Sequence, residues 1–212
     1  MTPPAATAAV RRRARTKYRT AVRRRRLAVA GGLALLAIVV PLAWPLAQKA
    51  YNDLSLPLSY TSIIRQQAAE KHLDPALVAA VIYAETKFDP RPSSAGAEGL
   101  MQILPQTAEF LAARSGATSF HVSDLATPAV NIAYGSYYLR YLLDEYRGNQ
   151  VLALAAYNGG ETNVNRWLAA ARRAGQAFTT AQIRFPETQA YVIKVMQAEQ
   201  EYRQTYGKQL YG

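Results

Sequence analysis

Residues 85–105 read ETKFDPRPSSAGAEGLMQILP and interrupt a chain that is otherwise patterned as helices. An apolar run ends at Glu85, and a new helical pattern opens at Pro105. Between them, Gly96 and Gly99 permit positive φ angles and a close approach of other backbone or of a ligand, where a Cβ atom would clash. We therefore expect a tight loop that turns the chain back directly after the helix that carries Glu85.

The helix before this loop carries an acid among apolar residues. Asp74 and Pro75 supply an N-cap and a first-turn proline, and Leu77, Val81 and Glu85 then recur every four residues on one face. Burial there would raise the pKa of the carboxyl, as a proton donor near neutral pH requires. The alternative is that Glu85, in the last helical turn, simply points into solvent.

The remaining pattern predicts an almost entirely α-helical domain. No stretch alternates apolar and polar residues over the length of a strand. Apolar periodicity and start signals instead predict helices at 61–73, 75–86, 105–114, 127–146, 149–158, 163–174 and 186–206.

The positive charge of the chain is confined to one end. The formal net charge is +11, but residues 11–26 hold ten Lys and Arg and no acid, whereas the 14 basic and 14 acidic residues of 51–212 cancel. The basic run precedes an apolar segment, which is typical of a topology signal and not of a nucleic-acid site. We therefore expect no nucleic-acid partner.

The apolar segment, residues 27–47, contains no charged side chain. As a helix it would cover roughly 30 Å, the thickness of a bilayer core. We expect a basic cytoplasmic tail at 1–26, a single transmembrane anchor at 27–47, a linker at 48–59 and a catalytic domain at 60–212 on the periplasmic or extracellular side of the cytoplasmic membrane. A cleaved signal peptide is the alternative, but it usually has a shorter apolar region and a better small-x-small site.

Several motifs together resemble one known family. Residues 85–105 resemble the first signature of the soluble lytic transglycosylase catalytic domain, whose fold is like goose-type lysozyme. AAYNGG at 155–160 resembles the second signature and PETQAYV at 186–192 the third. Residues 124–139 resemble the helix that the family places between the first two, so the likeness covers most of residues 60–206.

The resemblance implies an enzyme that acts on peptidoglycan glycan strands. Glu85 would protonate the β-1,4 glycosidic oxygen between N-acetylmuramic acid and N-acetylglucosamine. The same carboxylate would then accept the proton of the muramyl C6 hydroxyl as that oxygen attacks C1, leaving a 1,6-anhydromuramyl end. Water is not consumed, so a second carboxylate is not required.

The same resemblance implies a set of substrate-binding residues. Met101 would form an apolar floor, and Gln102 and Asn158 would bind sugar hydroxyl or acetamido groups. Each implied role has a structural alternative, such as core packing for Met101, helix capping at the end of the second signature, or the favourable helix dipole for the acid in the third. The full set is Ser93, Met101, Gln102, Tyr157, Asn158, Glu187 and Tyr191.

A few further residues bear on catalysis, on metal or cofactor binding and on the alternative functions. The family usually has Ser after its catalytic Glu, whereas this chain has Thr86, which keeps the hydroxyl. His72 and His121 are isolated, so we expect neither a metal nor a cofactor. Asp89 and Glu98 leave a hydrolytic muramidase open as an alternative, and a glycan-binding or scaffolding module that has lost catalysis is the other.

Overall fold

The computed structural model describes residues 30–31, 37–44, 56–90 and 93–212. It divides the chain into two compact units, 1–55 and 56–212. Most of the predicted anchor at 27–47 and the predicted tail at 1–26 lie outside the described residues. Within the described ranges, no helix has both the length and the apolarity needed to cross a membrane.

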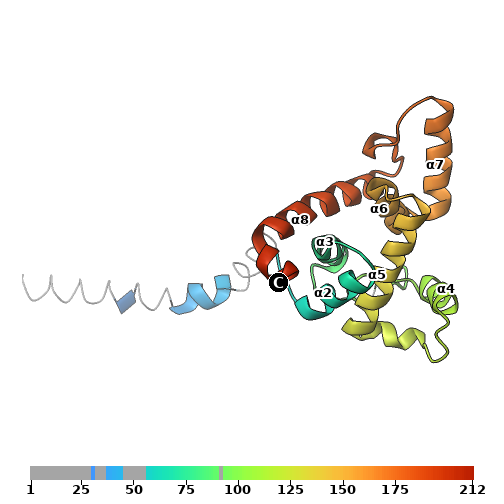
Figure 1. Cartoon of the computed structure of the whole chain (residues 1–212). Coiled ribbons are helices and arrows are strands. Elements are labelled where there is room, and N and C mark those ends of the chain that lie inside the picture. The colour runs from blue at the N-terminus through green and yellow to red at the C-terminus, as the bar shows by residue number, and fades with distance from the viewer. Residues whose placement is uncertain (1–29, 32–36, 45–55, 91–92) are drawn as a thin grey trace, which may run out of the picture. The chain divides into compact units, whose positions relative to one another are not determined.

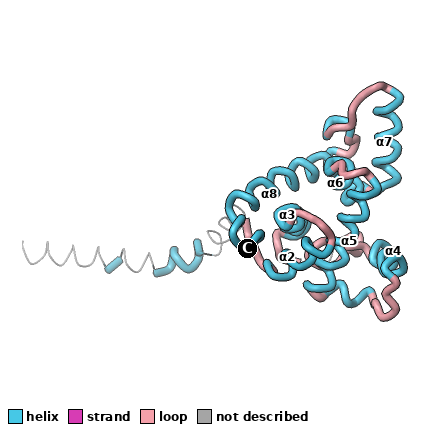
Figure 2. The backbone as a smooth tube through the Cα atoms, in the orientation of Figure 1, coloured by secondary structure: helices cyan, strands magenta, loops and turns pink. Residues whose placement is uncertain are grey.

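The second unit is a helical domain, as the sequence pattern predicts. Figure 2 shows helices joined by loops, and no strand occurs among the residues described in it. The α-helices are α2 (Thr61–Glu70), α3 (Pro75–Thr86), α4 (Pro105–Ser115), α5 (Pro128–Glu145), α6 (Gln150–Gly159), α7 (Glu161–Arg173) and α8 (Pro186–Tyr211), with short 3-10 helices η1 (Val122–Ala126) and η2 (Thr180–Gln182).

Helix α3 lies at the centre of this domain and ends at the candidate site. Figure 1 shows α8 curving around it, with α2 and α5 on other sides. Every residue from Ala76 to Ile82 is at most 5% exposed. The helix is therefore apolar on all sides rather than along one stripe, which is the pattern of a helix buried in a core. Its alanines allow close packing against α8.

The 26-residue helix α8 also fixes the start of the domain. The hydroxyl of Tyr202 donates a hydrogen bond to the carbonyl of Pro57, and Tyr206 donates one to the carbonyl of Leu56. Leu56 and Leu58 pack against the core. The last residues of the segment predicted as a linker, 56–59, thus lie against the helical domain.

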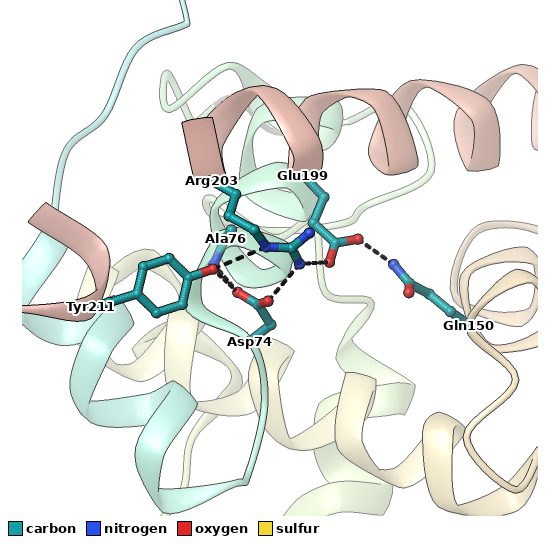
Figure 3. Close-up of polar contacts among 6 residues, drawn as sticks. All are labelled: Asp74, Ala76, Gln150, Glu199, Arg203 and Tyr211. Carbon is teal, nitrogen blue, oxygen red and sulfur yellow. Dashed lines mark hydrogen bonds and ion pairs between the residues drawn. The ribbon is translucent and has the colours of Figure 1, made fainter. Parts of the chain in front are cut away.

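A polar network ties the C-terminal end of α8 to the beginning of α3 (Figure 3). Asp74 caps α3, because its Oδ1 accepts a 2.8 Å hydrogen bond from the backbone N–H of Ala76. The same carboxyl accepts hydrogen bonds from Tyr211 and Arg203, both at 2.6 Å. Arg203 also pairs with Glu199, whose second oxygen accepts a hydrogen bond from Gln150. The network joins α3, α6 and α8 on the side that holds the chain end.

Candidate active site

Glu85 lies in the last turn of α3, where the apolar core gives way to the surface. The residue is half-buried, and burial raises the pKa of its carboxyl from 4.5 to about 7. An interaction with the Tyr191 hydroxyl and the positive charge of Lys194 oppose this rise without cancelling it. The carboxyl is therefore substantially protonated at neutral pH, which is the state a general acid needs.

The Tyr191 hydroxyl faces this carboxyl from α8. Its pKa lies well above its usual value, because of burial first and then the charge of Glu85. It is also one of three buried side-chain polar atoms that lack a well-formed hydrogen bond in the described residues; the others belong to Ser136 and Arg140. A buried hydroxyl without a well-formed hydrogen bond destabilises the fold unless an acceptor binds it. Glu85 is the group that this hydroxyl faces, and donation to its carboxylate form would satisfy the hydroxyl.

The loop after α3 has the conformation that its glycines predict. Gly96 and Gly99 adopt φ angles of 75° and 71°. A Cβ atom on Gly99 would lie 2.1 Å from the side-chain nitrogen of Asn131, so no larger residue fits there. An isolated antiparallel bridge between Glu98 and Ile103 closes the loop.

Three side chains, each from a different helix, hold this loop by hydrogen bonds to its backbone. The fully buried Asn131 of α5 accepts a hydrogen bond from the N–H of Met101 at 2.7 Å and donates to the carbonyls of Glu98 and Leu125. Thr86 of α3 donates to the carbonyl of Leu100 at 2.8 Å. The hydroxyl at position 86, which the sequence retains, therefore binds the loop directly.

The third contact comes from α6. The Tyr157 hydroxyl donates a hydrogen bond to the carbonyl of Met101 at 2.8 Å. Burial, followed by the charge of Glu85, raises its pKa well above the usual value. Tyr157 therefore joins the second predicted signature to the first and lies within electrostatic reach of Glu85.

A pocket of about 350 Å³ opens between the loop, α4, α5 and α6. Gln102, Tyr157 and Asn158 line it. The side-chain nitrogen of Gln102 also donates a 2.9 Å hydrogen bond to the carbonyl of Gly99. Asn158 is oriented by Thr188 of α8, which donates a 2.8 Å hydrogen bond to its side-chain oxygen. The lining residues are Gln102, Ile103, Leu104, Thr107, Tyr138, Ala156, Tyr157, Asn158, Gly159 and Gly160.

Three predicted substrate-binding residues occupy other places. Met101 is fully buried and fills the space over Gly135, where any Cβ atom would lie within 3 Å of its side chain. The Ser93 side chain accepts a 2.9 Å hydrogen bond from the N–H of Ala97 and so shapes the loop. Glu187 is exposed in the first turn of α8. None of these three lines the pocket, and Glu85 and Tyr191 are not among its lining residues either.

Sequence reasoning did not single out Asn131, Thr188 or Lys194. Asn131 could have been suspected as a polar residue within an apolar helical run, whereas the other two act through contacts that local sequence does not show. Tyr138, also not singled out, is half-buried and lines the pocket, and its ring centre lies 5.2 Å from that of Tyr157. Among the described residues, no group of three or more His, Cys, Asp or Glu could hold a metal ion.

The sequence is similar to those of known lytic murein transglycosylases. A soluble lytic murein transglycosylase from Escherichia coli strain K12 is 31% identical over 168 residues, covering 76% of this chain and 26% of that protein. A membrane-bound lytic murein transglycosylase C from Yersinia enterocolitica is 29% identical over 168 residues, covering 68% of this chain and 46% of that protein.

A solved structure has the same fold. The lytic transglycosylase Slt from Pseudomonas aeruginosa, described as an inactive mutant in which Gln replaces Glu, superposes with a TM-score of 0.65 at 29% identity, over 73% of this chain and 25% of that one. The chain thus spans about a quarter of the length of the first curated relatives that it matches. Residues 62–178 match the sequence model of the transglycosylase SLT domain, and the chain belongs to this family.

Proposed function

We propose that this protein is a peptidoglycan lytic transglycosylase. It cleaves the β-1,4 bond between N-acetylmuramic acid and N-acetylglucosamine and leaves 1,6-anhydromuramyl ends. Glu85 first protonates the glycosidic oxygen and then, as a carboxylate, accepts the proton of the C6 hydroxyl that attacks C1. No second carboxylate takes part.

The observation that carries this proposal is the burial of the Glu85 carboxyl at the end of α3, where it faces the Tyr191 hydroxyl. The Glu85 pKa of about 7 allows the group both to give and to accept a proton near neutral pH. The carboxylate that follows proton donation faces the buried Tyr191 hydroxyl, which interacts with Glu85 and has no other hydrogen-bond partner among the described residues. A hydroxyl that donates to this oxygen favours the charged form of the carboxyl.

The pocket supports a glycan substrate. Its amides, from Gln102 and Asn158, match sugar hydroxyl and acetamido groups, and its tyrosine rings match the apolar faces of pyranose rings. The relatives are named for their action on murein. Ser93 and Met101 take part by shaping the loop. We assign Glu187 a role at the outer edge of the site, because it shares a helical face with Tyr191, four residues later.

We also propose that residues 27–47 anchor the protein in the cytoplasmic membrane with the helical domain outside. Support comes from the uncharged composition of this segment and the ten basic residues of 11–26 before it. Residues 37–44 are helical, and Ile38, Leu42 and Trp44 expose more than half of their surface. Two of the curated relatives are named as membrane-bound.

Mass spectrometry of digested murein tests the proposed reaction. Purified sacculi are incubated with the full chain or with Glu85→Gln, and the released saccharides are weighed. Products lighter by one water than hydrolysis products, absent with Glu85→Gln, support the transglycosylase. Reducing-end products would point to a muramidase, and binding without release to a glycan-binding module.

A further inference from the structure

Lys194 reaches from α8 to the turn that carries Glu85. Its ammonium donates a 2.8 Å hydrogen bond to the carbonyl of Ala84, 110 residues away in the sequence and next to Glu85. The same ammonium lies 5.2 Å from the centre of the Tyr83 ring. Both contacts belong to the last turn of α3, which has no basic residue of its own there. Lys194 therefore supplies the positive charge that favours a helix C-terminus, from a neighbouring helix.

This position is close to Glu85 without forming an ion pair with it. Glu85 and Lys194 do not form an ion pair with each other among those found in the described residues. Each nevertheless affects the pKa of the other. A direct ion pair would lower the pKa of Glu85 strongly and remove the proton that the reaction needs. Because the Ala84 carbonyl holds the ammonium, its charge acts on Glu85 through space and more weakly.

We propose that Lys194 is a positioning residue of the reaction: held by Ala84 and Tyr83, it fixes the turn that presents Glu85 and stabilises the carboxylate formed when Glu85 gives up its proton. This inference rests on the proposed function. Proton donation leaves a negative charge in partly buried surroundings, which costs free energy unless a positive charge or a hydrogen-bond donor is already in place. Lys194 and the Tyr191 hydroxyl, three residues apart on one face of α8, meet this need together.

The other groups around Glu85 leave this role to Lys194. Tyr157 from α6 and Tyr191 from α8 lie near the carboxyl, and both are uncharged at neutral pH, as any tyrosine is; burial raises their pKa values further. Lys87, at the end of α3, is exposed. It acts on Lys194 by repulsion and contributes to the lowering of the Lys194 pKa, for which burial is the largest cause. The Lys194 ammonium is a partly buried cation that its contacts with the Ala84 carbonyl and the Tyr83 ring hold near Glu85.

The test compares pH profiles of glycan-strand cleavage for Lys194→Met, Lys194→Arg and the matched control Lys208→Met, which removes an exposed lysine from the same helix. Without the ammonium, Glu85 holds its proton more tightly. We expect the basic limb of the kcat profile to move up by roughly half a pH unit and kcat below that limb to fall about tenfold. Arg should restore the limb, and Lys208→Met should leave it in place.

A carbon NMR titration of the Glu85 carboxyl in the same variants supplies a second readout that needs no catalysis. A higher Glu85 pKa in Lys194→Met, restored by Arg, supports the proposal. A pKa and basic limb that stay in place, with activity merely scaled down, would overturn it by showing that Lys194 only supports the fold. If the unaltered chain releases no saccharides, the proposed function fails separately, and the titration still decides whether Lys194 acts on Glu85.

Discussion

The hydroxyl of Tyr157 donates a hydrogen bond to the main-chain carbonyl of Met101, 56 residues earlier in the chain, at 2.8 Å. This contact joins the α6 end of the pocket to the loop that follows α3. Because the ring of the same residue lines the pocket, one side chain both shapes the site and fixes the loop. Its loss should therefore affect folding and activity together.

Tyr157→Phe keeps the ring and removes the hydroxyl, which leaves the Met101 carbonyl without this donor. An unsatisfied buried acceptor costs about 1–3 kcal/mol, so the free energy of unfolding should fall by that amount in urea titrations. Tyr138→Phe is the matched control, because Tyr138 packs against Tyr157 and lines the same pocket. Equal stability of Tyr157→Phe and the unaltered protein would show that the hydrogen bond contributes nothing.

The two loop glycines should differ sharply in their tolerance of alanine. Both have positive φ, but a Cβ atom at Gly99 would clash with Asn131 and with the carbonyl of Leu125, whereas nothing lies within 4 Å at Gly96. We expect Gly96→Ala to cost about 1 kcal/mol for backbone strain alone and Gly99→Ala at least about 3 kcal/mol. Thermal unfolding measures both, and similar losses would contradict the close packing on Asn131.

The network of Figure 3 should stabilise the fold in a pH-dependent manner. Burial alone would raise the pKa of Asp74, but the hydrogen bonds from Tyr211, Arg203 and Ala76 lower it below 3.8. Stability from this group is therefore present above pH 4 and lost as pH falls further. Because the Arg203 side chain is 48% exposed, solvent screening limits Arg203→Met to a loss of about 1 kcal/mol at pH 7.

Chemical denaturation at pH 7 and pH 3 checks this expectation. Arg184→Met, which removes an exposed arginine outside the network, serves as the control. The difference between Arg203→Met and the unaltered protein should shrink at the lower pH. A difference that stays constant would mean that Arg203 acts through packing and not through its charge.

Replacing Glu85 should stabilise the protein in alkaline solution. Since the folded-state pKa is raised from 4.5 to about 7, the native protein binds more protons than the unfolded chain between these values, and its stability falls as pH rises through this window. Glu85→Gln removes the ionisation, so we expect it to be more stable than the unaltered chain by about 1–3 kcal/mol at pH 8. The two should converge near pH 4. Equal melting temperatures at pH 8 would argue against a buried acid.

Local sequence sufficed to predict the helices. Asp74 and Pro75 start α3, and Pro105, Pro128 and Pro186 each occupy the first position of a helix, where the missing N–H is no loss. The positive φ of Gly96 and Gly99 also follows from residue type. These features depend on neighbours in the chain.

The site itself depends on contacts between distant segments, and there prediction reached less far. The pattern placed Glu85 beside apolar residues, whose burial raises its pKa, but it did not show Tyr191 and Lys194 of α8, which limit that rise. Met101 looked like a pocket floor, although its side chain fills the space over Gly135, which no local pattern shows. Asn131 organises the loop through hydrogen bonds to residues 30 and 33 positions away.

The measurement closest to the central claim is a carbon NMR titration of the Glu85 carboxyl in the unliganded protein between pH 4 and pH 9. The account predicts one transition with a midpoint at about 7, absent in Glu85→Gln. A midpoint near 4.5, the ordinary value for a solvated glutamate, would contradict it, because the carboxyl would then hold no proton to donate at neutral pH.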